Sequence, residues 1–380
     1  MTAAPRKRVL ILPGDGIGPE ILAQTRRVVD WFVARRALPA DLYEEPFGIP
    51  AYRAHGSFLR DETWDEIEAA DAILFGAIGS PEYDTIPGAA EGAGLMRMRT
   101  ELGLFINLRP VRAAAPLHAV SPLKAEVLRQ TDLVIVRELT GGIYTGKPRG
   151  IETVDGVRRG VNTMIYSEPE IERITRAAFD LARTRRKRVC SVDKSNVLEV
   201  SRLWREVVQR LRDTAYSDVE LTHLFVDNAA MQLVRAPAQF DVLLTENLFG
   251  DILSDIGAAA AGSIGMLPSA SMTGMDADGP ARHRALYEPI HGSAPDIAGK
   301  GIANPCGAIL SFAMCLRHSF LRPDDAALLE AATIATIENG ARTADIARPG
   351  QPTLSTAEMG SAILRELDAM ADGWPAAARA

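Results

Sequence analysis

Cysteine is scarce in this sequence, because its 380 residues include only Cys190, Cys306 and Cys315. These residues form no CxxC pair and no zinc-ligand spacing, and a small, odd number of thiols is typical of a reduced compartment. We interpret all three as small core residues. Their scarcity argues against a secreted scaffold held together by disulfides, and we expect a cytoplasmic protein.

Long hydrophobic runs are also missing. The first apolar stretch, residues 9–12, is far too short for a signal peptide or a membrane span, so we expect no membrane partner. The 49 acidic and 42 basic residues give a net charge of -7, which argues against a general attraction to nucleic acid. We interpret the basic run at 183–188 (RTRRKR) as a solvated helix end.

Lysine is rare, with six among the 42 basic side chains, although 47% hydrophobic and 24% charged residues are ordinary for a folded globular protein. Lys194 stands out because it closely follows the apolar run 189–192. A partly desolvated lysine near a cation can act as a general base. An ordinary exposed lysine is the alternative that its position alone favours.

Short apolar runs alternate with helical patterns along the chain, which is long enough for two or three domains. The runs predicted as strands are 9–12, 72–75, 133–136, 189–192, 224–226 and 242–244. This alternation predicts an α/β fold with a largely parallel sheet covered by helices. Two segments crowded with Gly, Pro and small residues, 76–94 and 268–280, are predicted as loops.

A glycine-rich turn follows the first predicted strand. Gly14, Gly16 and Gly18 precede a helix expected to begin near Pro19, and this arrangement suggests a dinucleotide site. The fuller G-x-G-x-x-G pattern fails, because position 19 is Pro and no acidic residue closes an obvious strand about 20 residues later. The spacing therefore favours a tight structural turn over a Rossmann site.

Two carboxylates four residues apart follow the predicted strand 242–244. On a helix, Asp251 and Asp255 would share one face, where they repel each other unless a cation lies between them. Their oxygen atoms suit Mg²⁺ or Mn²⁺ better than zinc, but a solvated helix face explains the spacing equally well. Asp227, after another predicted strand, could complete a metal set or cap a helix.

Three arginines, Arg99, Arg109 and Arg137, lie beside apolar strands or turns. Guanidinium groups bind carboxylates through paired hydrogen bonds, so three that converge on one cleft would suit a dicarboxylate. In a chain this rich in arginine, each of them alone is more simply explained as a surface residue. Tyr144 follows a glycine-containing turn, where it could donate a proton or pack as an ordinary aromatic residue.

The small-residue loop from His291 to Asp296 contains one acid. A carboxylate there could accept hydrogen bonds from ribose hydroxyls and would repel a 2′-phosphate, which favours NAD over NADP. A simple turn is the alternative.

Taken together, these segments closely resemble the isopropylmalate dehydrogenase family of decarboxylating β-hydroxyacid dehydrogenases, over nearly the whole chain. The resemblance is carried, in the expected order, by LPGDGIGPE (12–20), LFINLRP (104–110), VRELTGGIYTGKPRG (136–150), SVDKSNVLEV (191–200), FVDNAAMQLVR (225–235), TENLFGDILSDIG (245–257) and YEPIHGSAPDIAGKGIANP (287–305).

The resemblance implies roles for the candidate residues in a homodimer with shared active sites. Arg99, Arg109 and Arg137 would hold the malate carboxylates, and Asp251 and Asp255 would bind Mg²⁺ or Mn²⁺. The other subunit would supply Asp227 to the metal and Lys194 as the proton relay for the C2 hydroxyl, while Tyr144 would protonate C3. The residues implied in NAD binding are Glu288, His291, Gly292, Ser293, Ala294, Asp296 and Asn304.

The family's fold would consist of two α/β domains that share a large mixed sheet and would not be a Rossmann fold. The implied NAD-binding domain is discontinuous (1–104 plus 262–380), and the implied central metal, substrate and dimerisation domain is 105–261. The implied reaction is oxidative decarboxylation of (2R,3S)-3-isopropylmalate to 4-methyl-2-oxopentanoate and CO₂ with NAD reduction, in leucine biosynthesis.

Substrate choice would depend on an apolar wall of Leu95, Met96 and Val197, which suits an alkyl group. Position 92 is Gly where the family usually has Glu, and position 100 is Thr where Lys is common. The lost Glu side chain would enlarge the pocket, so a bulkier malate such as 3-benzylmalate is an alternative, with D-malate a further one. The segment 272–286 is longer than usual for the family. A non-catalytic binding protein is disfavoured, because the catalytic and metal residues are all present.

Overall fold

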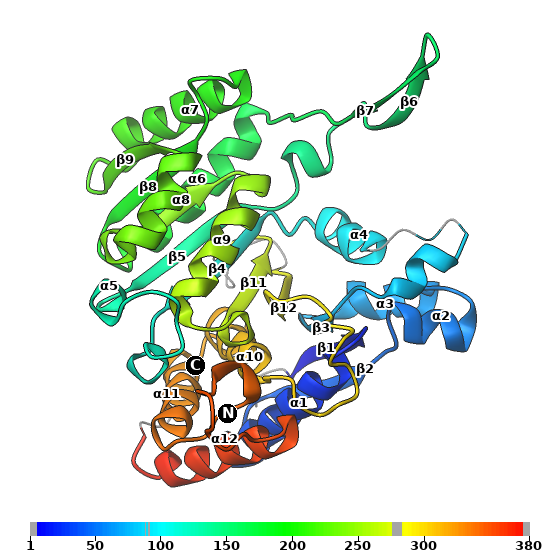
Figure 1. The fold of residues 1–380 in the computed structure, drawn as a ribbon, viewed down its shortest axis with the longest axis vertical. Helices are drawn as coiled ribbons and strands as arrows, with labels where there is room; N and C mark the ends of the chain where they lie inside the picture. The colour runs from blue at the N-terminus through cyan, green and yellow to red at the C-terminus, as the bar shows by residue number, and fades with distance from the viewer. Residues whose placement is uncertain (1–5, 88, 90–91, 276–282, 375–380) are drawn as a thin grey trace.

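The centre of the structure, a computed structural model that describes residues 6–87, 89, 92–275 and 283–374, is a ten-stranded mixed sheet. The order of its strands among the described residues is β2-β1-β3-β12-β11-β4-β5-β10-β8-β9 (Figure 1). The strand bounds are β1 Lys7–Gly14, β2 Ala40–Glu44, β3 Ala72–Ala77, β4 Ile106–Arg112, β5 Asp132–Glu138, β8 Arg188–Asp193, β9 Glu220–Phe225, β10 Val242–Thr245, β11 Pro268–Met272 and β12 Ala285–Pro289.

Helices cover both faces of this sheet. The helix bounds are α1 Gly18–Arg36, α2 Ile49–His55, α3 Asp61–Ala69, α4 Ala93–Glu101, α5 Ala125–Leu128, α6 Glu168–Arg183, α7 Glu199–Ala215, α8 Val226–Arg235, α9 Asn247–Ala261, α10 Cys306–His318, α11 Pro323–Glu338 and α12 Thr356–Ala371. Within the described residues, no helix combines the length and apolar character needed to cross a membrane.

Two parallel groups of strands make up most of the sheet. One group is β2, β1, β3 and β12, and the other is β5, β10, β8 and β9. The strands β11 and β4 join them through three antiparallel pairings, so the two groups run in opposite directions. The predicted large mixed sheet is confirmed. It runs without a break through both predicted domains, whose boundaries stay a prediction.

All six predicted strands are present, with one difference at a strand end: β9 stops at Phe225, and Val226 already begins α8. The predicted loop at 268–280 is wrong in its first part, because β11 is a buried strand at the middle of the sheet. Its small side chains let α10 approach closely. A Cβ added at Gly307 of that helix would lie only 3.1 Å from the carbonyl oxygen of Leu267. Residues 276–280 fall outside the described part.

The second predicted loop, 76–94, is also partly structured. Residues 76–77 belong to β3, a short 3-10 turn spans Pro81–Thr85, and α4 begins at Ala93. Residues 88, 90 and 91 of this segment lie outside the described residues.

The apolar core differs between the two faces of the sheet. On one face, Val9 and Ile11 of β1 join a single large cluster with α1, α6, α7, α10, α11 and α12. On the other face, Leu10 and Leu12 belong to a cluster with α3 and α4, and a separate cluster packs α8 and α9 against β5 and β10. The strict alternation along β1 follows from the two-residue period of a strand. Each fully buried Val, Ile or Leu side chain contributes about 1.5–3 kcal/mol to the free energy of unfolding.

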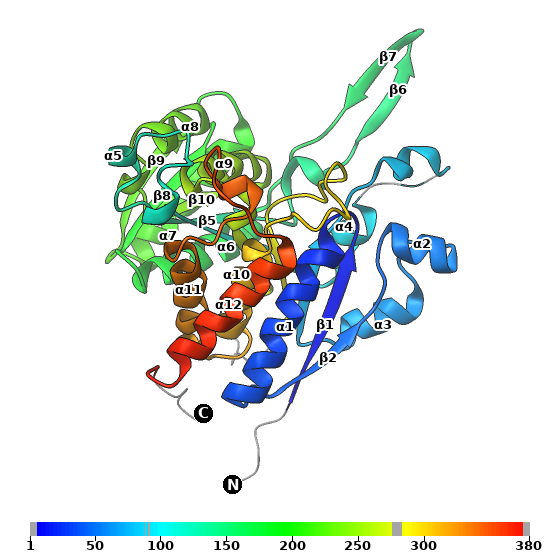
Figure 2. The ribbon, with the colours of Figure 1, turned by 60° about the horizontal axis from the view of Figure 1, so that its bottom comes forward.

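A two-stranded hairpin projects from this body as an arm (Figures 1 and 2). Its strands are β6, Gly150–Val154, and β7, Val157–Val161, and they pair only with each other in the described structure. The exposed fractions of Ile151 and Val157 are 73% and 67%. An isolated hairpin is marginally stable in water, so apolar side chains on an arm of this kind need a partner surface.

The glycine-rich turn after β1 has the structural role that its spacing favoured. Gly14 and Gly16 have φ angles of +70° and +58°. A Cβ at Gly14 would lie 2.0 Å from the carbonyl oxygen of Ala77, and one at Gly16 would lie 2.1 Å from that of Ser293. The chain's own backbone therefore fills the space beside these glycines, and the turn locks β1 against the loop that begins at His291.

Gly16→Ala should lower the free energy of unfolding by about 3 kcal/mol, because it adds a backbone collision to the cost of a positive φ angle. Gly103→Ala is the matched control: its φ is +70°, but no atom lies within 4 Å of the added Cβ. The control should lose about 1 kcal/mol. Urea denaturation of both variants measures the difference, and equal losses would contradict the proposed lock.

Candidate active site

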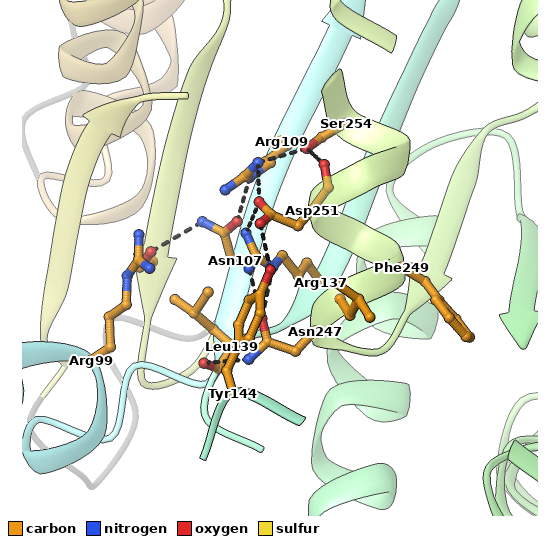
Figure 3. A network of polar contacts seen from close by, with 12 residues as sticks. Arg99, Asn107, Arg109, Arg137, Leu139, Tyr144, Asn247, Phe249, Asp251 and Ser254 are labelled. Atoms are coloured by element: carbon orange, nitrogen blue, oxygen red, sulfur yellow. Dashed lines mark hydrogen bonds and ion pairs between the residues drawn. The ribbon is translucent and has the colours of Figure 1, made fainter. Parts of the chain in front are cut away.

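Two buried arginines from neighbouring strands meet a carboxylate from the helix that covers them. Arg137 of β5 lies opposite Asn107 of β4, which places Arg109, two residues further along β4, on the same face. Asp251 of α9 accepts hydrogen bonds from Arg137 Nη1 at 2.6 Å and from Arg109 Nη1 at 3.3 Å. Its second oxygen accepts one from the Tyr144 hydroxyl at 2.9 Å. Figure 3 shows these groups converging on Asp251.

The close packing of α9 on β5 depends on a glycine. A Cβ at Gly250 would lie 2.8 Å from Cβ of Arg137 and 2.4 Å from the hydroxyl of Thr245. Glu246 starts the helix by accepting hydrogen bonds from the backbone N–H groups of Leu248 and Phe249. Side-chain capping of this kind satisfies amide groups that the helix leaves free. Gly250 therefore brings the next residue, Asp251, within reach of both arginines.

Two asparagines hold the arginine side chains in place. The Asn247 side-chain oxygen accepts hydrogen bonds from Arg137 Nε at 3.0 Å and Nη2 at 2.7 Å, and its amide donates to the carbonyls of Leu139 and Gly141. Asn107 accepts from Arg109 Nε at 2.8 Å. The sequence analysis missed both asparagines. Their positions could have indicated them, because Asn107 lies two residues before Arg109 and Asn247 lies four residues before Asp251.

Burial and charge set the protonation of this cluster. Desolvation lowers the pKa of Arg109 and of Arg137. The charge of Arg99 lowers the pKa of Arg109 further, and the charge of Arg109 lowers that of Arg137 further. Desolvation alone would raise the pKa of Asp251, but Arg137 and Arg109 outweigh it and bring the pKa below its usual value. Desolvation, followed by the charge of Asp251, raises the pKa of Tyr144. The tyrosine therefore keeps its proton near neutral pH.

A small pocket of about 140 Å³ adjoins the cluster and brings the third arginine to it. Its lining includes Leu95, Arg99, Arg109, Glu288 and His291. Arg99 Nη2 donates to Glu288 at 2.8 Å. Two buried atoms, Arg99 Nε and His291 Nε2, have no hydrogen-bond partner in the described part of the chain. The pocket thus presents unused hydrogen-bonding capacity beside two guanidinium groups, as expected for a site that binds an anion.

The predicted substrate wall is only partly assembled within one chain. Leu95 lines the pocket and is buried. Met96 is half-buried on the same helix without lining the pocket among the described residues. Val197 is 63% exposed. Leu95 is thus the one wall residue placed at the pocket within the described chain, and the wall roles of all three residues stay predictions.

Lys194 and Asp227 form a pair of their own, away from the arginine cluster. Lys194 Nζ lies 2.6 Å from Asp227 Oδ1. The hydrogen bond from Lys194 lowers the pKa of Asp227. Among the described residues, no hydrogen bond or ion pair joins either side chain to Asp251 or Tyr144. In the described part of one chain, this pair is therefore separate from the hydrogen-bond network around Asp251.

The predicted cofactor loop is anchored at both ends. The Ser293 carbonyl accepts the backbone N–H of Ile17, and Asn304 donates to Asp345 at 3.0 Å and caps the first residue of α10. Asp345 was missed by the sequence analysis, because it lies far along the chain in an unremarkable turn. Asp296, between the anchors, and Gly292, just before the first, are exposed, and Ala294 has a φ of +42°. The loop therefore offers exposed groups on a fixed backbone, but its contacts alone do not identify a ligand.

The predicted metal ligands fit a divalent cation incompletely within one chain. Asp251 and Asp255 lie one helical turn apart, and desolvation, with the neighbouring Asp251 charge, raises the pKa of Asp255 above its usual value. A cation between the two carboxylates would relieve that repulsion. Within the described residues of one chain, no group of three His, Cys, Asp or Glu side chains is arranged to hold a metal. The oxygen donors of Asp251 and Asp255 suit Mg²⁺ or Mn²⁺, and the metal-binding roles stay a prediction.

Acids of the same chain pair with much of the basic run at 183–188. Arg183 lies 2.7 Å from Asp218, Arg185 lies 2.8 Å from Asp241, and Lys187 lies 3.6 Å from Asp218. The interpretation of the run as a solvated helix end holds for the exposed Arg183 and Lys187. It is wrong for Arg185, which is largely buried against Asp241, and for Arg188, which begins β8.

The sequence and the fold match a known family of dehydrogenases. The sequence profile described as "Isocitrate/isopropylmalate dehydrogenase" matches residues 8–363. The chain therefore belongs to the isocitrate/isopropylmalate dehydrogenase family.

Relatives and solved structures show where the chain lies within this family. A "3-isopropylmalate dehydrogenase 1" from Bradyrhizobium diazoefficiens is 58% identical over 362 residues, which cover 95% of each chain. A "3-isopropylmalate dehydrogenase" from Paramagnetospirillum magneticum is 54% identical over 95% of this chain and 98% of its own. The crystal structure of isocitrate dehydrogenase from Methylococcus capsulatus has a TM-score of 0.81 and 34% identity, covering 95% of this chain and 99% of its own.

The stability of the protein should depend on pH through Glu246. Burial raises the pKa of this carboxyl from 4.5 to about 7. Its stabilising contribution is therefore full below pH 4.5 and is lost as the pH rises through 7. In Glu246→Gln, the decrease in unfolding free energy between pH 4.5 and 8 should shrink by about 3 kcal/mol.

Denaturant unfolding at several pH values measures this effect. Glu358→Gln is the control, because Glu358 also lies beside a helix N-terminus but has a pKa lowered by hydrogen bonds from Ser355. Its removal should change the pH dependence in the opposite sense. Identical pH profiles for the wild type and Glu246→Gln would show that the carboxyl ionises normally.

Proposed function

We propose that this chain catalyses the NAD-dependent oxidative decarboxylation of (2R,3S)-3-isopropylmalate to 4-methyl-2-oxopentanoate and CO₂, in leucine biosynthesis. The observation that carries the proposal is that Arg99 and Arg109 line one pocket, while Arg137 binds Asp251 beside Arg109. Asp251 also accepts a hydrogen bond from Tyr144. The names of the relatives that are 58% and 54% identical agree with this reaction. The three buried free thiols suit a cytoplasmic enzyme.

The arginines account for the binding of a dicarboxylate. Arg109 and Arg137 share the single carboxylate of Asp251, and Arg99 is paired with Glu288. Asp255 adds a third negative charge near Arg109 without a direct contact. Arg99 Nε has no hydrogen-bond partner among the described residues, so a substrate carboxylate could accept a hydrogen bond from it. Leu95 provides an apolar contact at the same pocket, which suits an alkyl substituent better than a third carboxylate.

The proton steps are assigned to Tyr144 and Lys194. The Tyr144 hydroxyl is protonated near neutral pH and is fixed by its hydrogen bond to Asp251, so it can donate to C3 after CO₂ has left. Lys194, paired with Asp227 in the same chain, would accept the proton of the C2 hydroxyl in the active site of the other subunit. Each proton would thereby move to or from a positioned side chain.

The proposed cofactors are NAD and Mg²⁺ or Mn²⁺. Asp251 and Asp255, with Asp227 of the second subunit, would hold the metal, and Glu288 and the loop His291–Asn304 would hold NAD. When bound, NAD supplies the hydride acceptor, and the metal supplies a positive charge that stabilises the enolate left by loss of CO₂. Arg99, Arg109 and Arg137 would meanwhile orient the substrate.

A homodimer is proposed because the exposed apolar residues lie near Lys194 and Asp227. The exposed fractions of Met231 and Val234 on α8 and of Ile252 on α9 are 46%, 45% and 50%, although the two helices pack on each other. The same surface carries Asp227, and the arm formed by β6 and β7 offers further apolar side chains. A second copy covering this face would bring Lys194 and Asp227 to the other chain's arginine cluster.

Purified enzyme with Mn²⁺ and NAD should give the highest kcat/KM with 3-isopropylmalate, compared with 3-benzylmalate, D-malate and isocitrate. This ratio measures discrimination between substrates, and NADH absorbance follows the reaction. A preference for 3-benzylmalate would favour the alternative of a bulkier substrate. One observation supports that alternative: among the residues that the structure describes, no atom lies within 4 Å of a Cβ placed on Gly92. Failure with all four compounds would contradict the proposed function.

Mixed dimers test whether each active site uses residues of both chains. Lys194→Met and Tyr144→Phe should each lower kcat by about 10²- to 10⁴-fold. When equal amounts are unfolded together and refolded, half of the dimers contain one chain of each kind. Every mixed dimer then has one intact site, so activity should return to about a quarter of the wild-type value.

If both residues served the site of their own chain, the mixture would stay inactive. Tyr43→Phe, which removes a hydroxyl from an exposed tyrosine on β2, is the control for the tyrosine change and should keep full activity. Wild-type protein taken through the same refolding sets the value for full recovery.

A further inference from the structure

The central strands carry a second and larger cavity on the face opposite the active site. Its volume is about 600 Å³, against about 140 Å³ for the pocket beside Arg99. Cavities that bind small molecules span about 300–1,000 Å³. The proposed reaction has no role for this space, because the residues assigned to the reaction do not line it.

The pleat of β4 places the two cavities back to back. Leu108, Pro110 and Arg112 line the second cavity, whereas Arg109, between them in sequence, points to Asp251. Strand β11 shows the same alternation, because Pro268 lines the second cavity and its neighbour Ser269 lines the pocket beside Arg99. A shift of either strand would therefore move residues of both cavities at once.

The walls of the second cavity come from both halves of the sheet. Leu181 of α6 lies on one side, and Met314 of α10 and Ile334 of α11 lie on the other. Other lining side chains are also apolar, including Leu117 and Val134. A ligand in this space would contact helices that pack on different ends of the sheet, so its binding would depend on their separation.

The charged rim of the cavity has an excess of arginine. Arg185 pairs with Asp132 at 2.9 Å and Arg317 pairs with Glu330 at 2.7 Å. Arg112 has only the longer contacts, at 3.5 Å, to those same two acids. Arg185 and Arg186 also share Asp241 behind the rim, so four guanidinium groups face three carboxylates in this network. The network therefore has one more positive charge than negative charges. Among the arginines that line the cavity, Arg112 makes the longest contacts with carboxylates.

A neutral imidazole completes the lining. Burial lowers the pKa of His318 to about 4, so the ring carries no charge near neutral pH. The cavity therefore combines apolar walls with one guanidinium group, that of Arg112, whose contacts to carboxylates are all long. A dicarboxylate would find only one cation without its own close partner, whereas a neutral hydrocarbon would leave Arg112 unused.

We propose that this cavity is a second ligand site for an amphipathic monocarboxylate, and that its occupancy changes substrate affinity at the active site. The hydrocarbon tail lies against Leu117, Val134, Met314 and Ile334, and the carboxylate binds Arg112. Binding couples to the active site because the ligand contacts both halves of the sheet and because β4 carries Arg109 on its other face. A coupling of this kind is a free energy shared by the two sites.

Octanoate is the probe, because it has one carboxylate, an apolar tail and no hydroxyl that could be oxidised. Isothermal titration calorimetry on the full-length enzyme with Mn²⁺ should detect one octanoate per chain, with a Kd below about 1 mM. Saturating 3-isopropylmalate should leave that site available while shifting its Kd. Reciprocally, saturating octanoate should change the KM for 3-isopropylmalate.

Three variants locate the bound octanoate. Ile334→Trp fills the cavity and should weaken binding by about tenfold or more. Arg112→Gln removes the rim charge and should weaken binding about fivefold. Arg26→Gln is the matched control, since Arg26 is an exposed arginine on α1, paired with Glu44, and does not line the cavity. It should bind like the wild type.

The outcomes separate this proposal from the proposed function, because octanoate binding is measured without turnover. Absence of binding would overturn the proposal, and so would full competition by 3-isopropylmalate or equal affinity in Ile334→Trp and Arg112→Gln. Binding at the cavity with an unchanged KM would overturn the coupling. A shift in KM that disappears in Arg112→Gln, with the basal activity of that variant retained, would support both parts.

Discussion

The ion pairs of Asp251 with Arg137 and Arg109 are the interaction on which the site depends. Burying a charged group costs several kcal/mol unless partners compensate it, and here one carboxylate serves two buried guanidinium groups. Asn247 and Asn107 accept further hydrogen bonds from the two guanidinium groups without adding negative charge. The cluster is therefore fully oriented but electrically incomplete, which is the state in which an anionic substrate binds most favourably.

The position of α9 connects this charge balance to the rest of the fold. Gly250 lets the helix lie against β5, Glu246 holds its first turn, and the apolar residues of α8 and α9 pack on the same face of the sheet. The active-site face has two separate apolar clusters, one with α3 and α4 and one with α8 and α9. Residues from both regions meet at the pocket beside Arg99. A mixed sheet that extends through both halves gives these groups a common support.

The sequence predicted strands that are rich in large apolar residues and failed for a strand made mostly of small ones. Runs of Val, Leu and Ile marked β1, β3, β5, β8 and β10 well, because a strand buried on both faces needs continuous apolar residues. Strand β11 was missed, since Pro268–Met272 consists of small residues that resemble a loop. They are small because α10 packs closely on them. That requirement comes from a neighbour distant in sequence, so no local pattern could reveal it.

The sequence by itself determined which residue types are available for chemistry: two aspartates one helical turn apart, three arginines beside strands, a rare lysine and a tyrosine after a glycine turn. Only the tertiary structure decided which of them meet. Arg109, Arg137, Asp251 and Tyr144 converge because the register of β4 and β5 and the approach of α9 bring them together. Lys194 binds Asp227 elsewhere on the chain. Spacing along a chain constrains only near neighbours, whereas contacts between distant segments depend on the packing of whole elements.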